Sequence, residues 1–188
     1  MSNTITDTDI KIKSMFILGN DYSLLDDTTK DKIDILYESS VIKALTKYRW
    51  GFCRETTELI GQELNNNKYK YSFTLPEDFL TLINVYDDLK ETSINNDYEL
   101  TTILRANREK IYLKYIKRVD TSLFPSTFIE YLIYELACEL CFNLTGDYNL
   151  LQLLETKKQE KYEIACNIDA RQRKPYNFLH NPFNDVRN

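Results

Sequence analysis

The sequence predicts an α+β fold in which helices at both ends pack around a central long helix, with a small antiparallel β-sheet inserted between them. Apolar residues recur at helical spacing towards both ends of the chain, but with a period of two between residues 69 and 119. The longest apolar segment, residues 128–144, directly follows the period-two region. At 188 residues the chain is long enough for one domain with a sizeable core.

Two helices are expected before the sheet. The first runs from Asp9 to Leu18 and stops at Gly19-Asn20. The second follows the N-cap residues Asp26-Asp27-Thr28 and continues to about Tyr48. Its apolar stripe, at three- and four-residue steps, comprises Ile33, Leu36, Tyr37, Ser40, Val41, Ala44, Leu45 and Tyr48.

The sheet is expected to span about residues 50–119, beginning with an extended segment near Trp50. Residues from Tyr69 to Leu75 alternate between apolar and polar, as in a half-buried strand. Pro76 ends this strand, and in the following turn Asp78 can accept hydrogen bonds from local backbone amides. Further strands are expected at residues 82–86, 98–104 and 111–116, with loops at 87–97 and 105–110.

The segment from Phe128 to Leu144 is expected to be the central helix. Thr127 and Glu130 fit a capping box at its start, and Gly146 fits a stop after its end. Three glutamates within it argue against a membrane span, because each would cost up to about 2.5–3.5 kcal/mol in the bilayer. The helix is apolar nearly all round, which indicates burial on two sides. The residues expected at a subunit interface on its second side are Tyr131, Tyr134 and Phe142.

A last helix, which Asp147 can cap, is expected from Asp147 to Arg173, so that residues 1–174 form a single α+β domain. Residues 175–188 lack periodicity but carry large apolar side chains, which predicts an extended tail that docks on the surface of another protein. Basic residues precede this tail, where cations suit the C-terminus of a helix. The expected docking residues are Arg171, Arg173, Lys174, Tyr176, Phe178, Leu179 and Phe183.

The composition excludes several classes of protein. A formal net charge of −5 and a pI near 5.1 argue against a broad basic surface that grips nucleic acid. Four glycines argue against phosphate-binding loops, and four scattered cysteines predict reduced thiols in a cytosolic setting. The polar, acidic start of the chain predicts no signal peptide. The 14 tyrosines and 9 phenylalanines fit either protein interfaces or the codon usage of an AT-rich genome.

The residues show no constellation that indicates catalysis, a metal or a cofactor. Cys138 and Cys141 form a C-x-x-C pair, but they lie in an apolar helix without two further zinc ligands at suitable spacing, so buried structural thiols are expected. The single histidine, His180, lies in the unpatterned tail, where Ser–His or Cys–His catalysis is not expected. The sequence also lacks nucleotide, zinc-protease and calcium-loop motifs. We therefore expect a protein without enzymatic activity.

Short motifs nevertheless follow one another in a specific order between Leu36 and Ala170. Trp50-Gly51-Phe52-Cys53 is similar to a W-x-F-A motif, and the run from Tyr71 to Asp78 to Y-x-Y-x-L-P-x-D. They are followed by Val85-Tyr86, Leu113-Lys114-Tyr115, Leu123-Phe124-Pro125-Ser126-Thr127-Phe128, Leu136-Ala137, Leu144-Thr145-Gly146-Asp147, Ala165 and Asp169-Ala170. In this order the chain resembles the tail tubular protein A family, the head-to-tail adaptor of short-tailed phages and a neck ring protein of crAss-like phages. Cys53 stands where this family favours alanine, and the N-terminal residues do not align.

The resemblance implies a structural virion protein that forms a homo-oligomeric ring, usually of twelve subunits, on the portal vertex below the DNA-filled head. Such a ring contacts the portal protein on one side and the tail tube or a second neck ring protein on the other. The genome leaves through its lumen without specific binding to the protein. The family assembles in the host cytoplasm and ends in the virion neck, and it implies no cofactor and no membrane contact.

Two other classes of function fit the sequence. One is a small phage-encoded intracellular enzyme, which turnover without oligomerisation would favour. The other is a monomeric regulatory module that binds DNA, which a gel shift with salt-dependent affinity would favour.

Overall fold

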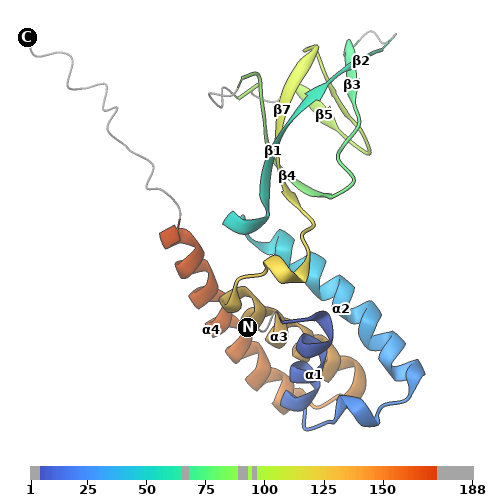
Figure 1. Cartoon of the computed structure of the whole chain (residues 1–188), viewed down its shortest axis with the longest axis vertical. Coiled ribbons are helices and arrows are strands. Elements are labelled where there is room, and N and C mark those ends of the chain that lie inside the picture. Colours follow the sequence, from blue (N-terminus) through green and yellow to red (C-terminus); the bar gives the residue numbers. More distant parts are fainter. Residues whose placement is uncertain (1–4, 65–67, 89–92, 95–96, 173–188) are drawn as a thin grey trace, which may run out of the picture.

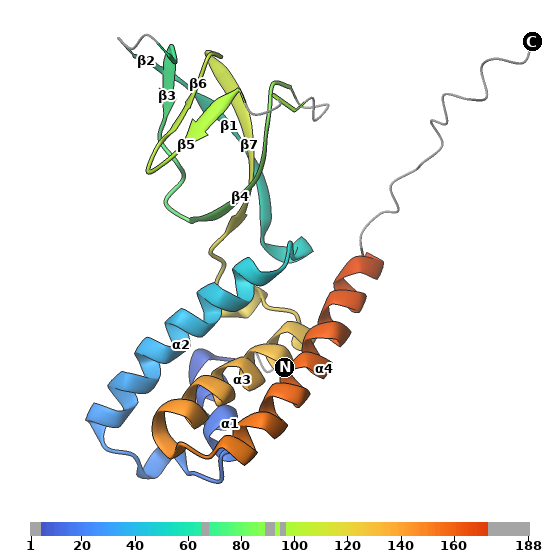
Figure 2. The ribbon, with the colours of Figure 1, turned by 180° about the vertical axis from the view of Figure 1, so that it is seen from behind.

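The computed structural model describes residues 5–64, 68–88, 93–94 and 97–172. Within these ranges, four α-helices form a bundle at one end of the molecule, and seven strands form two antiparallel sheets at the other end (Figure 1). The same separation is visible from behind (Figure 2). The chain leaves the helical part after Cys53 and returns to it after Lys117.

The chain is α+β, but the predicted arrangement of its elements is wrong. The strands do not form one small sheet inserted between helices, because they build a part of their own beside a single helix bundle. The helix predicted to be central and long is not a long helix either. The helix in that segment, α3 (Ser126–Leu140), has 15 residues, fewer than the 21 of α2 (Asp27–Lys47) or the 25 of α4 (Tyr148–Gln172). The period of two predicts strands, but it does not determine which other elements the strands pack against.

Helix α1 (Asp7–Ile17) is held at its start by a capping box. The Thr6 hydroxyl accepts from the Asp9 amide at 3.2 Å, and the Asp9 carboxylate accepts from the Thr6 amide at 2.8 Å. After the helix, Gly19 has a φ of 75°, in the left-handed region that glycine adopts without strain. A short 3₁₀ turn, η1 (Tyr22–Leu24), then leads towards α2.

The predicted cap and stripe of α2 are largely confirmed. Asp26 accepts a hydrogen bond from the Thr29 amide at 2.8 Å and so satisfies a free donor of the first turn. Leu36 and Tyr48, which belong to the predicted stripe, are half-buried. The buried residues of α2 are Ile33, Tyr37, Ser40, Val41, Ala44 and Leu45.

The capping box predicted at the start of α3 is wrong. Pro125 occupies the N-cap position, and no side chain caps this end. Glu130, the predicted partner of Thr127, instead forms an ion pair with Lys161 on α4 at 2.8 Å. Contact with a neighbouring helix has therefore replaced the local bond that the spacing predicts.

The end of α3 also differs from the prediction. Residues Cys141–Thr145 form a π-helical turn, in which the Thr145 hydroxyl donates to the Cys141 carbonyl at 2.9 Å. Asn143 similarly donates to the Glu139 carbonyl at 2.7 Å. Side chains that bond the backbone in this way compete with a regular helix. The turn ends at Gly146, whose φ is 63°.

Helix α4 begins at the predicted cap. Asp147 accepts hydrogen bonds from the Asn149 and Leu150 amides at 3.0 and 3.1 Å. In the bundle, α3 packs against α1, α2 and α4. None of the helices within the described ranges is long and apolar enough to cross a membrane.

The strands form two sheets with their own core. The first sheet has the order β1 (Arg54–Ile60), β7 (Lys110–Lys117), β4 (Phe79–Tyr86), and the second has the order β2 (Gln62–Glu63), β3 (Tyr71–Phe73), β6 (Leu104–Ala106), β5 (Tyr98–Leu100). The strand predicted at 98–104 is two strands, because the chain reverses where the Thr101 amide donates to the Ile103 carbonyl at 3.0 Å. The core cluster of this part comprises Phe73, Val85, Ile94, Leu104, Ala106, Ile111, Leu113 and Tyr115.

The two parts of the molecule meet at the end of β7. Ile116 and Val119 belong to the core cluster of the helix bundle. The Arg118 amide donates to the Asp78 carbonyl at 2.7 Å, and the Arg118 guanidinium forms an ion pair with Glu38 on α2 at 2.9 Å. Apolar and polar contacts together therefore hold the sheets against the bundle.

The side chain of Asp78 also contributes to this region. It was predicted to bond local amides, but its carboxylate accepts from the hydroxyl of Tyr115 on β7 at 2.9 Å. Burial raises the pKa of Tyr115, and the bond to Asp78 raises it further. Asp78 therefore ties the turn after Pro76 to a distant strand.

Candidate interaction surface

An aromatic cluster lies where α2 gives way to the 3₁₀ turn η2 (Gly51–Cys53). Trp50, at its centre, is 1 % exposed, and its Nε1 donates to the Ala44 carbonyl at 2.8 Å. The ring centroids of Tyr48 and Phe128 lie 4.8 and 5.1 Å from that of Trp50, both in edge-to-face geometry. The Trp50 cluster, as we call it, comprises Tyr48, Trp50, Phe52, Phe124, Phe128, Tyr131 and Tyr162.

Residues from three of the family-like motifs meet at this cluster. Phe52 and Phe124 both pack against Phe128, with ring centroids 5.0 and 4.9 Å away. The Gly51 amide donates to Asp169 Oδ1 at 2.6 Å, so the end of α4 is bonded to the segment after α2. These motif residues therefore hold the subunit together through packing and backbone hydrogen bonding.

We expect Asp169→Ala to lower the free energy of unfolding by about 1.5–3 kcal/mol, as for hydrogen bonds to charged groups. The substitution removes the acceptor that lies 2.6 Å from the Gly51 amide. Urea denaturation followed by the fluorescence of Trp50 measures the change. Asp169→Asn keeps an acceptor oxygen and should cost less than half as much, so equal losses in the two variants would contradict this role.

A buried ionic network joins α2, α3 and α4. Glu135 on α3 is 1 % exposed, and its two carboxylate oxygens lie 2.6 Å from Lys43 Nζ and 4.0 Å from Lys158 Nζ. The Tyr131 hydroxyl donates to Glu135 at 3.0 Å, and Lys43 also contacts Glu139 at 2.6 Å. Burial opposes ionisation of Glu135, but Lys43 and Lys158 outweigh burial, so the pKa of Glu135 lies below its ordinary value of 4.5. This carboxylate is enclosed and paired, which suits a structural role.

Three of the four cysteines are also enclosed. Cys53, Cys138 and Cys141 are buried, and burial raises the pKa of both Cys53 and Cys138 to about 12. A thiol with such a pKa stays protonated and unreactive near neutral pH. In the part of the chain that the structure describes, no three His, Cys, Asp or Glu residues are placed to hold a metal ion. His180 lies outside the described residues.

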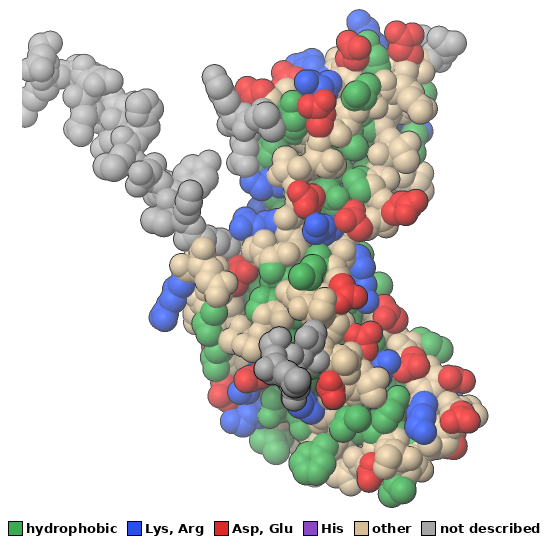
Figure 3. All heavy atoms as spheres, in the orientation of Figure 1, with side chains coloured by type: hydrophobic (Ala, Val, Ile, Leu, Met, Phe, Trp, Pro, Cys, Tyr) green, Lys and Arg blue, Asp and Glu red, His purple; other side chains and the backbone are tan. Residues whose placement is uncertain are grey.

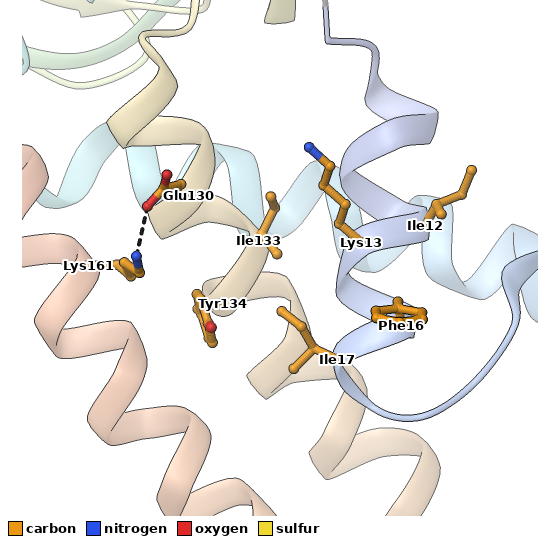
Figure 4. A pocket seen from close by; sticks show the side chains of 8 residues that line it. All are labelled: Ile12, Lys13, Phe16, Ile17, Glu130, Ile133, Tyr134 and Lys161. Atoms are coloured by element: carbon orange, nitrogen blue, oxygen red, sulfur yellow. Dashed lines mark hydrogen bonds and ion pairs between the residues drawn. The ribbon is translucent and has the colours of Figure 1, made fainter.

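An open apolar groove crosses the bundle surface between α1, α3 and α4 (Figure 4). We call it the α1 groove. Its volume is about 420 Å³, and on its α1 side the side chains of Phe16 and Ile12 are 81 % and 44 % exposed. The ion pair between Glu130 and Lys161 lies on its α4 side (Figure 4). The lining residues are Ile12, Lys13, Phe16, Ile17, Glu130, Ile133, Tyr134 and Lys161.

A second hollow, of about 410 Å³, shares Ile12 and Phe16 with the α1 groove and extends to Gly19 and Tyr22. The exposed Phe16 ring therefore borders both hollows. On the face shown in Figure 3, hydrophobic side chains gather at the bundle end, and acidic and basic side chains are interspersed over the whole face. Exposed apolar surface of this kind is typical of a binding site for another chain segment or protein.

The three residues predicted at a subunit interface differ in their exposure in the structure. Tyr131 is fully buried in the Trp50 cluster, so its predicted place on the surface is wrong. The helix has no second outer face at this position, because Tyr162 of α4 covers Tyr131, with ring centroids 5.2 Å apart. Tyr134 lines the α1 groove, and Phe142 on the π-helical turn is 61 % exposed. Both side chains can reach a neighbouring molecule.

Of the predicted docking residues, Arg171 is exposed near the end of α4. The others, Arg173, Lys174, Tyr176, Phe178, Leu179 and Phe183, lie outside the described residues. The sequence reasoning did not find the groove, although helical spacing on α1 carries the signal. Ile10, Ser14 and Ile17 share one side of α1, whereas Ile12 and Phe16 share another and remain exposed.

No model of a protein family matches the sequence. No curated protein matches it either. The resemblance to the tail tubular protein A family, which depends on short ordered motifs, therefore stays a prediction.

Proposed function

We propose that this chain is a structural subunit of an oligomeric ring that connects the portal of a phage head to the tail and lines the channel through which DNA leaves. The proposal begins from the ordered motifs between Leu36 and Ala170. One observation in particular supports it. The residues of three such motifs meet at the Trp50 cluster, where they pack against one another or form hydrogen bonds. Motifs that build a scaffold suit a structural protein better than an enzyme.

The surface of the subunit supports the same proposal. Side chains such as Phe16, Tyr134 and Phe142 offer apolar contacts that a ring subunit can use towards its neighbours. The thiols of Cys53, Cys138 and Cys141 and the Glu135 carboxylate are enclosed and have little access to a substrate. We propose that the chain acts without catalysis and without a cofactor.

The net charge suits a channel for DNA. Twelve chains at −5 each would give a ring a formal charge of −60. An acidic ring repels phosphate groups, so DNA can pass through it without being retained. In this proposal the portal protein binds one side of the ring and the tail tube or a second neck ring protein binds the other, in the neck of the virion.

Mixing the purified chain with the portal protein from the same genome tests the proposal. We expect both proteins to sediment together in a density gradient. Reversing the charges of Arg171, Arg173 and Lys174 to Glu should abolish co-sedimentation, because these cations precede the proposed docking tail. A control that reverses the exposed Lys32, Lys70 and Lys157 gives the same change in charge at scattered positions and should leave it intact. Failure of the wild-type chain to sediment with the portal, or equal loss in both variants, would contradict the proposed docking.

A further inference from the structure

We propose that in the free subunit the α1 groove is occupied by the C-terminal segment of the same chain, residues 175–188. This intramolecular contact goes beyond the ring function and does not depend on it. The segment lies outside the described residues, and the properties of the groove together with the sequence and length of the segment support this contact.

The groove leaves apolar surface in water that an occupant would cover. Phe16 is 81 % exposed and Ile12 is 44 % exposed, and both border the two hollows of about 420 and 410 Å³. Tyr134 and Ile17 add apolar surface to the larger hollow. Burial of a large apolar side chain contributes about 1.5–3 kcal/mol, so covering these residues is favourable.

The C-terminal segment has complementary chemistry. It carries Tyr176, Phe178, Leu179 and Phe183 without a pattern that would bury them against each other. Ordering each residue costs about 1–2 kcal/mol, and only burial on another surface can offset that cost. Tyr176, Phe178 and Leu179 form one group of large side chains, and Phe183 follows four residues after Leu179. Two such groups suit a surface with two adjoining hollows.

The length of the segment permits this contact within one chain. Lys161, on the rim of the groove, precedes the end of α4 at Gln172 by 11 residues. At about 1.5 Å per residue, the helix end lies only about 16 Å beyond Lys161. A chain that turns back after Pro175 spans roughly 3.3 Å per residue, so Tyr176 to Phe183 reach roughly 13–36 Å from Gln172.

Tethering also favours this occupant over the same segment of a second copy. A segment joined by a short linker has an effective concentration in the millimolar range at a site that it can reach.

A labelled peptide of residues 173–188 tests the proposal on the full-length chain. In one variant, Phe178, Leu179 and Phe183 are changed to Ser, so that the attached segment can no longer compete for the groove. We expect the peptide to bind this variant, as measured by fluorescence anisotropy, and to bind the wild-type chain at least ten-fold more weakly. Adding Phe16→Ser should abolish binding, whereas Ile35→Ser, at an apolar residue of α2 that is also largely exposed (71 %), should leave it unchanged.

Each other outcome overturns the proposal. Absence of peptide binding to the Ser variant would show that the segment has no affinity for the groove. Equal binding to both chains would show that the wild-type groove is open. If the wild-type chain is a dimer in light scattering and the Ser variant is a monomer, the occupant comes from a second copy. None of these measurements uses the portal protein, so their failure is distinguishable from failure of the ring proposal.

Discussion

Trp50→Ala is expected to lower the free energy of unfolding by about 3–5 kcal/mol, the range for deleting a large buried aromatic side chain. Trp50 is 1 % exposed and stands at the centre of the aromatic cluster between α2, α3 and α4. The substitution leaves a cavity there and also leaves the Ala44 carbonyl without the indole donor at 2.8 Å. Urea denaturation should be followed by circular dichroism at the helix band, because the variant has lost the only tryptophan.

Two controls separate the contributions to this loss. Trp50→Phe retains a ring in the cluster and should cost clearly less than Trp50→Ala. Ile35→Ala removes an apolar side chain that is 71 % exposed and should change the free energy of unfolding by less than about 0.5 kcal/mol. An unchanged urea midpoint in Trp50→Ala would contradict the central position of this residue.

Removing both cations from the buried network should have an effect of similar size. We expect the double variant Lys43→Met, Lys158→Met to lose about 3–5 kcal/mol at pH 7, because Glu135 would remain buried without either cation. Adding Glu135→Gln should recover more than half of the loss, since a neutral amide can still accept from the Tyr131 hydroxyl. The control Lys32→Met, Lys157→Met removes two exposed lysines from the same helices and should have little effect.

The loss of stability in the double variant should depend on pH. In the wild-type chain the pKa of Glu135 is lowered in the folded state, so its stabilisation is present above pH 4.5 and is lost as the pH falls through the folded-state pKa. In the double variant, burial without cations raises that pKa, so stability is lost as the pH rises. The difference between the two proteins should therefore grow from pH 4 to pH 7. A difference that is constant or shrinks over this range would show that Glu135 is not the group responsible.

Local signals in the sequence predict much of the helical part. Asp26 and Asp147 cap α2 and α4 where expected, and Gly146 marks the turn before α4, because each of these features depends on a few adjacent residues. The predicted stripe of α2 is mostly buried for the same reason, since helical spacing alone determines which residues share a side.

Features that depend on distant partners could not be predicted in this way. Thr127 and Glu130 have the spacing of a capping box, but Glu130 forms an ion pair with Lys161 from another helix instead. The sequence places Tyr131 on an outer face of α3, but in the structure Tyr162 covers it. Asp78 accepts a hydrogen bond from the hydroxyl of Tyr115, which lies on a strand far along the chain. The two-sheet arrangement has the same cause. Alternation along β7 is visible in the sequence, but the division of its residues between two cores depends on the packing of the whole chain.

The candidate site was only partly predictable. Tyr134 was expected to be available for contact and lines the α1 groove, but the exposed side of α1 was missed. Phe16 lies within the helix predicted from Asp9 to Leu18. Its spacing from Ile12 indicates a second side, but only the packed structure shows that this side remains uncovered among the described residues.

Electron microscopy of the purified chain, alone and co-expressed with the portal protein from the same genome, tests the proposed function most directly. We expect closed rings of about twelve subunits with a central channel, seated on the portal where both proteins are present. Separate single subunits under both conditions, at every concentration that can be imaged, would contradict it.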